Sequence, residues 1–551
     1  MQQILPGVSI EVRPEGLITP GQVSISTLGV VGTANRGPVE DPVIVGNAAD
    51  ARAIFGEPGT FDEDNPGDAL SLVRALEIAF DNGARDAIAV RVADSAATAS
   101  FTVQSAGGDC CTLVASSPGT WGNDLGINVT TSDEDAVVSD EEIDGAGPLT
   151  LAFTPIVESA QTRVSVRPSG ATSTTDFDVL FTGAPNPGEV VIDTAGGGLT
   201  FNAADAPAAG DTVIVTYVVA SASARVVTLT QGAEEESYLV VSGQDLADQL
   251  EDSALAELDD TAANPNIDEL PTEFTPDNLV EFFSGGTDGA ATANYQLGLD
   301  ALLQENAHII VAAGQDNSQV GAGLTSHVIQ ASSDLNKRER IGVVGSAPDA
   351  SLDDVLGHTI ANERMVFVAP GVRLFDRGTG ADVTMPGSYA AALVAGMISG
   401  FPINRSLTNK AIPVSGLEET YSTAELRQLV LARVLAIEER LGFRTVKGIT
   451  TATLTAFSQI TTVRIVDFAK AGVRSAANPY IGLLNNSRVR AALQATIDAF
   501  LSEMVLSEQL VSYDLNVTAT RADEIRGIVR VTMTLRPVFS IDFIKVTMFL
   551  E

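Results

Sequence analysis

Two separated stretches of the chain alternate apolar strand-like segments with helical ones, and this alternation limits the possible folds most strongly. In the first stretch, buried strands are expected at residues 24–32 and 87–92, with a largely apolar helix at 70–80 between them. The alternation resumes near residue 295. Strands alternating with helices predict an α/β layer, whereas the Thr- and Val-rich strands and Gly, Pro, Asn and Asp turns of residues 100–280 predict β-rich domains.

These shifts in pattern predict a mixed α+β and α/β multidomain protein with five regions. A Pro- and Gly-rich arm precedes a discontinuous α/β core. A small β-rich domain, also discontinuous, carries an inserted β domain, and a helix–strand domain ends the chain. In that order, the expected boundaries are 1–22, 23–95 with 286–420, 96–131 with 222–285, 132–221, and 421–551. Within the last region, one long helix face is expected over 426–437 and a second helix over about 487–506.

The formal charge of −39 is distributed unevenly along the chain. Five lysines and 27 arginines stand against 71 Asp and Glu residues, which excludes a broad phosphate-binding surface for nucleic acid. Residues 421–551 contain 15 basic and 12 acidic residues, net +3, whereas the first 420 contain 17 and 59, net −42. We expect another protein to cover so neutral a domain. Acidity with few lysines also indicates a salt-rich host, because salt screens the self-repulsion.

Isolated strand-like segments are expected at both ends of the chain. Near the N-terminus, Val8, Ile10 and Val12 alternate with polar residues between two prolines. Two alternating segments, 528–535 and 541–550, close the chain. Their apolar side chains are those of Val529, Val531, Met533, Leu535, Ile541, Phe543, Ile544 and Val546. A lone strand needs a partner sheet, which another chain can provide.

Residues that could carry chemistry are few. The three histidines, His308, His327 and His358, have no second His or Cys at metal-ligand spacing, and the two cysteines are adjacent. Ser388 opens a small-residue helix, as the nucleophile of subtilisin-like proteases does, but His358 lacks the Gly-rich setting of a triad histidine. We therefore expect no catalytic, cofactor-binding or metal-binding residues. No secretory signal or membrane span is predicted either, so the expected protein is soluble.

Two polar segments need a separate interpretation. Gly285, Gly286, Asp288 and Gly289 form a Gly-rich run without the Lys-Ser/Thr ending of a P-loop, and we interpret it as a flexible domain hinge. The acidic run 133–144 lacks the ordered spacing of an EF-hand loop and is expected to be a solvated linker.

Several segments, taken in order, resemble the contractile tail sheath proteins of phages, archaeal viruses and phage-like injection systems. The resemblance covers the chain except for about 132–221, and residues 401–413 lack the aromatic and Ala-Pro pattern that many phage sheaths show there. The similar segments are the N-terminal residues 6–11, the run 29–38, the segment 80–85 ahead of a strand, the Gly-Trp-Gly-Asn-type turn in 117–123, the hinge 285–289 and the terminal helix–strand–strand unit.

The resemblance implies a mechanical role without cofactors. It implies a subtilisin-like α/β core without catalysis, which would account for Ser388, and terminal strands that exchange between subunits. The implied subunit polymerises as stacked rings or a helical sheath around an inner tail tube and contracts, driving the tube through the host envelope for genome ejection. The implied partners are further copies of the chain, the tube protein, and baseplate and tail terminator proteins, with no direct nucleic acid contact and no membrane insertion.

The resemblance also implies a location for each region. It implies a virion tail sheath assembled in the host cytoplasm, with 421–551 facing the tube and 132–221 on the outside. Other interpretations stay open: a surface-layer or adhesin-like β-rich protein, the sheath of a host-encoded injection system, and a subtilase-like enzyme acting through Ser388.

Overall fold

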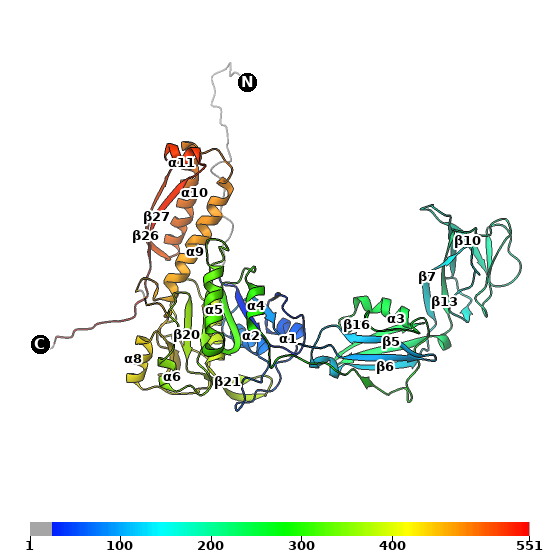
Figure 1. The fold of residues 1–551 in the computed structure, drawn as a ribbon, viewed down its shortest axis with the longest axis horizontal. Helices are drawn as coiled ribbons and strands as arrows, with labels where there is room; N and C mark the ends of the chain where they lie inside the picture. The colour runs from blue at the N-terminus through cyan, green and yellow to red at the C-terminus, as the bar shows by residue number, and fades with distance from the viewer. Residues whose placement is uncertain (1–24, 454, 550–551) are drawn as a thin grey trace, which may run out of the picture. The chain divides into compact units, whose positions relative to one another are not determined.

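The chain crosses twice between two separately folded units in the computed structural model, which describes residues 25–453 and 455–549 (Figure 1). Unit 1 contains the described residues up to Asp94 and from Gly289 onward, and unit 2 is Ser95–Asp288. The predicted linking residues Val8, Ile10 and Val12 lie outside the described residues. The mixed α/β architecture with several sheets agrees with the sequence-based expectation.

Unit 1 is built on an eight-stranded sheet in which six central strands are parallel and both edge strands are antiparallel to their neighbours. The strand order is β2-β3-β1-β18-β19-β20-β24-β25. The strands are β1 Leu28–Gly32, β2 Val43–Val45, β3 Ala87–Arg91, β18 Ile309–Asp316, β19 Ile341–Gly345, β20 Met365–Ala369, β24 Leu435–Glu439 and β25 Phe443–Thr445. Strands β1, β3, β19 and β20 are buried along their whole length because helices cover both faces.

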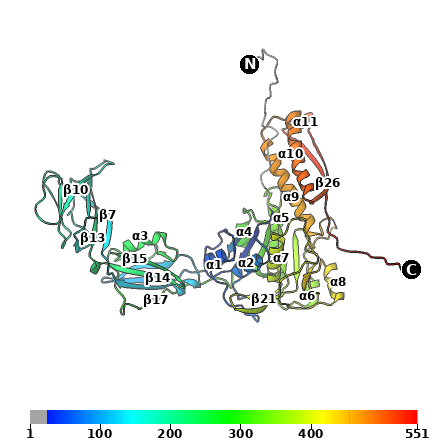
Figure 2. The same cartoon turned by 180° about the vertical axis from the view of Figure 1, so that it is seen from behind.

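The helices of unit 1 form a layer on each face of this sheet (Figure 2). One layer contains α1 Ala48–Phe55, α2 Leu72–Asp81 and α7 Gly387–Gly400, and the other contains α4 Tyr295–Leu302, α5 Asn317–Ala331, α6 Leu352–Leu356 and α8 Thr423–Leu431. Helix α7 is almost wholly buried. Its small residues allow this, since a Cβ at Gly396 would lie 2.3 Å from the carbonyl oxygen of Ala79 in α2.

Residues 426–437, expected as one long helix face, form a helix and a strand instead. Helix α8 ends at Leu431, Arg433 adopts a positive φ of 68°, and β24 begins at Leu435. The apolar run is short enough to suit either structure, and parallel pairing with β20 decides for a strand.

A small antiparallel sheet lies beside the main one. It consists of β21 Val372–Asp376, β22 Ala381–Met385 and β23 Gly416–Leu417. The buried Arg74 of α2 donates from Nε to Asp376 Oδ1 at 2.7 Å, which ties α2 to β21.

The C-terminal part of unit 1 pairs a helical hairpin with a two-stranded sheet. Its elements are α9 Ile460–Ala477, α10 Ser487–Leu506, β26 Leu510–Thr518, α11 Arg521–Ile525 and β27 Arg530–Pro537. Strand β27 alternates half-buried and exposed residues, as expected, and Val529, Val531 and Leu535 pack on the helices. Residues 538–549, named the tail here, contain no helix or strand, so residues 541–549 of the second expected strand, 541–550, do not form a strand in the single chain. A strand needs a pairing partner, and none of the described strands provides one.

Unit 2 contains two small sheets around one core. One sheet contains β4 Ser100–Ser105, β5 Gly108–Ala115 and β16 Ala256–Leu258, and the other contains β6 Gly126–Thr131, β14 Arg225–Gln231, β15 Glu234–Val240 and β17 Glu281–Phe282. Helix α3, Gly243–Gln249, and a 3₁₀ turn at Thr120–Asp124 complete this part. The turn places the single tryptophan, Trp121, in the core.

The chain between β6 and β14 forms a third sheet in unit 2. Its strands are β7 Ala136–Asp144, β8 Ile156–Val157, β9 Arg163–Arg167, β10 Thr175–Leu180, β11 Glu189–Ile192, β12 Leu199–Phe201 and β13 Thr212–Val219. The acidic run 133–144, expected as a linker, is mostly β7 and pairs with β13. An edge strand tolerates its carboxylates because only alternate side chains face the core.

Candidate subunit-linking site

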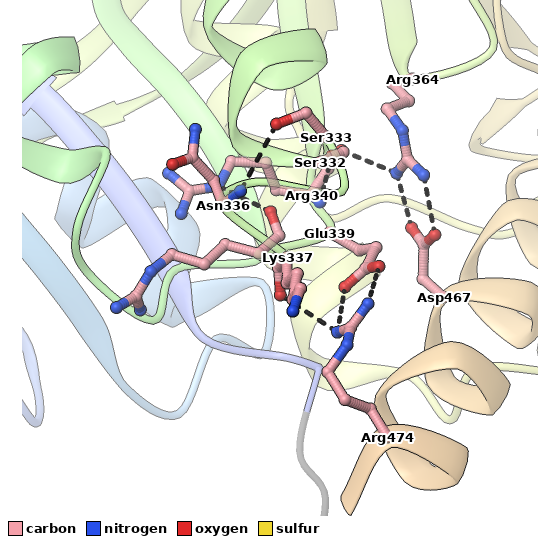
Figure 3. Close-up of polar contacts among 10 residues, drawn as sticks. Ser332, Ser333, Asn336, Lys337, Glu339, Arg340, Arg364, Asp467 and Arg474 are labelled. Atoms are coloured by element: carbon pink, nitrogen blue, oxygen red, sulfur yellow. Dashed lines mark hydrogen bonds and ion pairs between the residues drawn. The ribbon is translucent and has the colours of Figure 1, made fainter. Parts of the chain in front are cut away.

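Two arginine–carboxylate pairs fix the C-terminal helical hairpin to the segments that directly precede strands β19 and β20 of the main sheet (Figure 3). Arg364, directly before β20, donates to both carboxylate oxygens of Asp467 in α9 at 2.8 and 2.9 Å. Arg474, also in α9, donates to both carboxylate oxygens of Glu339 at 2.8 and 3.0 Å. Such bidentate pairs fix orientation as well as distance. We call these four residues the clamp.

We treat the clamp pairs as ionised, although Arg364, Asp467 and Glu339 are buried and only Arg474 is partly exposed. Burial opposes the charge of Arg364, but the hydrogen bonds to Asp467 keep its pKa above the ordinary value. Burial raises the pKa of Asp467, and Arg364 opposes that shift. Both oxygens of Asp467 accept from a guanidinium that stays protonated, and this charge-assisted bidentate contact favours the carboxylate, so we treat this carboxyl as ionised. Burial also acts against the charge of Glu339, but Arg474 holds its pKa below the usual range.

Residues considered for catalysis are not arranged for it. Ser388 is buried, and its Oγ makes no hydrogen bond to any described residue. His358 Nε2 donates to the carbonyl oxygen of Ala432 at 2.6 Å, and Arg340 Nη1 donates to His327 Nε2 at 2.9 Å. A nucleophile needs a base within hydrogen-bond reach, and the described residues place no histidine there for Ser388.

The buried His327 and the half-buried His308 should make the protein less stable in mild acid. Burial first, and then the charge of Arg340, lowers the pKa of both His308 and His327 from 6.5 to about 4. Below pH 6.5 the unfolded chain binds protons that the folded chain excludes, so stability falls between about pH 6.5 and 4. The loss approaches roughly 3 kcal/mol for each histidine.

Urea unfolding followed by circular dichroism at pH 7.5 and pH 5 tests this expectation. A His308→Gln, His327→Gln double variant serves as the control, since it removes both titrating groups. We expect the control to lose less stability between the two pH values than the parent. An equal loss in both proteins would contradict the assignment.

The predicted hinge lies where the chain returns from unit 2 to unit 1. Gly286 N donates to Asn123 Oδ1 at 2.8 Å, and Asn123 Nδ2 donates back to the Gly286 carbonyl at 2.9 Å. Asp288 accepts from Thr120 N and Oγ1 at 2.6 and 2.9 Å. Positive φ values of 90° at Gly285 and 60° at Gly289 favour glycine. The Gly-Trp-Gly-Asn-type turn and the glycine run therefore meet in space, and bending here stays a prediction.

The tail exposes an unusual run of apolar side chains. Seven large apolar residues within eleven positions are 61–89% exposed. They are Phe539, Ile541, Phe543, Ile544, Val546, Met548 and Phe549. Single exposed apolar residues are common, but a contiguous exposed row is typical of a surface that contacts another molecule. The predicted linking residues Ile541, Phe543, Ile544 and Val546 all belong to this row.

The sequence interpretation missed the clamp. Asp467 follows Val463 by one helical turn on the buried face of α9, and a charged residue at an apolar position was the available signal. Its partner Arg364 lies 103 residues away, and nothing in the sequence pairs the two.

The described residues contain neither a side-chain cluster suited to a metal ion nor a helix suited to crossing a membrane. Their His, Cys, Asp and Glu side chains form no group of three that could hold a metal ion. Among the described helices, none combines the length and apolarity needed to cross a membrane.

The C-terminal segment matches a known protein family. Residues 453–551 match the family described as the phage tail sheath C-terminal domain, and these residues include the helical hairpin, β26, β27 and the tail. The resemblance to tail sheath proteins is confirmed. A curated relative, the tail sheath protein of Staphylococcus phage Twort, is 28% identical over 170 residues. That match covers 30% of this chain, and the chain spans only 28% of the relative's length.

Solved structures extend the likeness to nearly the whole fold. The sheath tail protein of Desulfitobacterium hafniense superposes with a TM-score of 0.58 at 14% identity, covering 97% of this chain and all of the other. The sheath tail protein Lin1278 of Listeria innocua gives the same TM-score and identity, covering 96% of this chain and 95% of the other. The chain therefore shares the fold of sheath tail proteins.

Proposed function

We propose that the chain is the structural subunit of a contractile tail sheath, which polymerises around an inner tube and contracts to drive it through a host envelope. The observation that carries the proposal is the family match of residues 453–551, since these residues include the exposed tail. A fold shared with sheath tail proteins over 97% of the chain supports it. The proposed role is mechanical: contraction draws on packing energy stored in the assembled subunits.

Strand exchange between subunits is the proposed link. The apolar row of the tail supports it, because unpaired backbone and exposed apolar side chains are what an added strand buries. In this proposal the tail adds to the two-stranded sheet of a neighbour, beside Val529, Val531, Met533 and Leu535 of that neighbour's own chain. Val8, Ile10 and Val12 add a further strand.

The remaining roles follow from this arrangement. Gly285, Gly286, Asp288 and Gly289 act as a hinge between the units, and the α/β core is a subtilisin-like layer without catalysis. Residues 421–551 face the tube, and 132–221 decorate the outside. The assembly contacts baseplate and terminator proteins, and it forms in the cytoplasm of a halophilic host as part of a virion tail.

Removing the tail should abolish assembly and leave the subunit folded. We expect a variant ending at Pro537 to keep its helical circular dichroism, because the removed apolar side chains are exposed. It should form no tubes by electron microscopy under conditions in which the full chain does. Ordered tubes of the shortened chain would contradict the proposed link.

Removing the inserted sheet, in contrast to removing the tail, should leave assembly intact. Strands β6 and β14 are antiparallel neighbours, Thr131 pairs with Arg225, and Ser132 N donates to the Ala224 carbonyl at 3.3 Å. The ends of the insertion therefore meet, and a short hairpin turn can replace residues 133–223. This variant should still form tubes. Its failure to assemble would give the insertion a structural role.

A further inference from the structure

The usual pattern of solvent exposure is reversed at the start of the tail, where a charged side chain is largely buried between exposed apolar ones. The side chain of Asp542 is 12% exposed, whereas its neighbours Ile541 and Phe543 are 79% and 81% exposed. Carboxylates normally stay in water and apolar side chains leave it. A withdrawn carboxylate between exposed apolar residues therefore has a specific reason, and its contacts give that reason.

Asp542 is held by side chains from separate segments of its own subunit. Lys447 Nζ lies 3.3 Å from Asp542 Oδ2. Gln459, directly before α9, donates from Nε2 to the same carboxylate at 3.4 Å, and Thr408 Oγ1 donates at 3.4 Å. Ser540 of the tail itself adds a hydrogen bond at 3.0 Å. These donors make a carboxylate socket on the subunit, defined by Thr408, Lys447 and Gln459.

The lysine of this socket contacts the tail a second time. Lys447 Nζ lies 5.6 Å from the centre of the Phe543 ring, within cation–π range. It is also one of only five lysines in the chain. The tail is thus fixed at residues 540–543, and its other apolar side chains stay exposed beyond that point.

We propose that Asp542 anchors the tail to its own subunit and sets the register in which residues 543–549 pair with a neighbour. This proposal rests on the strand exchange of the proposed function. Side chains alternate along a strand, so Ile544, Val546 and Met548 lie on one face and Phe543 and Phe549 on the other. A slip of one residue exchanges the two faces. An anchored start removes that freedom before the neighbour arrives and lowers the ordering cost of pairing.

The anchor itself is tested in the full-length monomer with a nitroxide label at Val546→Cys. The native cysteines are buried, and labelled parent protein measures their background. Asp542→Ala removes a charge-assisted hydrogen bond, so the mobile component of the label spectrum should rise roughly tenfold in population. Lys447→Met should give the same change. The double variant Asp542→Lys with Lys447→Asp exchanges the two charges and should return the mobile component to the level of the parent. The control Asp514→Asn, which changes an exposed carboxylate on β26, should leave the spectrum unchanged. An unchanged spectrum in Asp542→Ala would overturn the anchor.

The register is tested by insertions between Asp542 and Phe543. One inserted alanine exchanges the faces of residues 543–549 and should abolish tubes, whereas two alanines restore the faces and should recover them. Equal assembly of both variants would overturn the register role. If the parent chain forms no tubes at all, the proposed function fails, and the label spectrum still decides whether Asp542 is an anchor.

Discussion

The Asp467→Ala variant is expected to lower the free energy of unfolding of unit 1 by about 3–5 kcal/mol. Asp467 and Arg364 are nearly buried, and two hydrogen bonds of 2.8 and 2.9 Å join them. Removing the carboxylate leaves the guanidinium of Arg364 nearly buried, with a hydrogen bond to the carbonyl oxygen of Arg340 at 3.2 Å but without the carboxylate that balanced its charge. The unpaired charge destabilises the fold by more than the pair stabilised it, because a buried guanidinium cannot be hydrated again.

The two units can be followed separately in this experiment. The only tryptophan, Trp121, lies in unit 2, so its fluorescence reports that unit, whereas far-ultraviolet circular dichroism is dominated by the long helices of unit 1. The Asp467→Ala variant should shift the circular dichroism transition in urea and leave the fluorescence transition in place. A shift of both together would mean that the units unfold as one.

Two further variants separate charge from packing. Arg440→Ala breaks the pair between the exposed Arg440 and the partly buried Glu438 and should change stability by less than about 1 kcal/mol. Replacing both buried partners, as in Arg364→Met with Asp467→Leu, should recover much of the loss, since no charge then stays buried. If the double variant is as unstable as Asp467→Ala, packing and not charge explains the effect.

Local patterns in the sequence were sufficient for elements whose periodicity agrees with their packing. The helix expected at about 487–506 is α10, Ser487–Leu506, and the strand expected at 87–92 is β3. The long helix face expected at 426–437 was wrong because a strand pairing with β20 competes with helix continuation, and the sequence does not contain that partner's position. Strand β7 was missed for the same reason: its many carboxylates are typical of a solvated linker, and only its pairing with β13 makes it a strand.

The candidate site was predictable in part for a related reason. The alternation of apolar and polar residues in the tail is a local pattern, so the sequence alone indicates it. The clamp and the Asp542 socket are not local: Arg364 and Asp467 lie 103 residues apart, and Thr408 lies 134 residues from Asp542. Charged residues are too numerous in this chain for such pairs to stand out, and only the fold selects them.

The division into units also sharpens the charge pattern. Residues 95–288, which make up unit 2, contain 32 acidic residues and three arginines, net −29, and no lysine. The rest of the chain therefore carries only −10. Repulsion within unit 2 cannot be relieved by pairing, because basic partners are almost absent. Mobile cations from the solvent are what remains to screen it.

Unit 2 is therefore expected to lose stability in dilute salt far more than unit 1. The screening length is about 3 Å at 1 M salt and about 30 Å at 0.01 M, so charges across the whole unit interact only in the dilute buffer. We expect the thermal midpoint of the Trp121 fluorescence to fall by roughly 10 °C between these conditions. The circular dichroism midpoint should move less.

A matched variant tests the cause of this effect. Glu235→Gln with Glu257→Gln removes two exposed charges, one from β15 and one from β16, and keeps the shape of both side chains. It should raise the midpoint in dilute salt and change it little in concentrated salt, because repulsion matters only where it is unscreened. Equal gains in both conditions would assign the effect to local strand packing, and no salt dependence in the parent would contradict the halophilic interpretation.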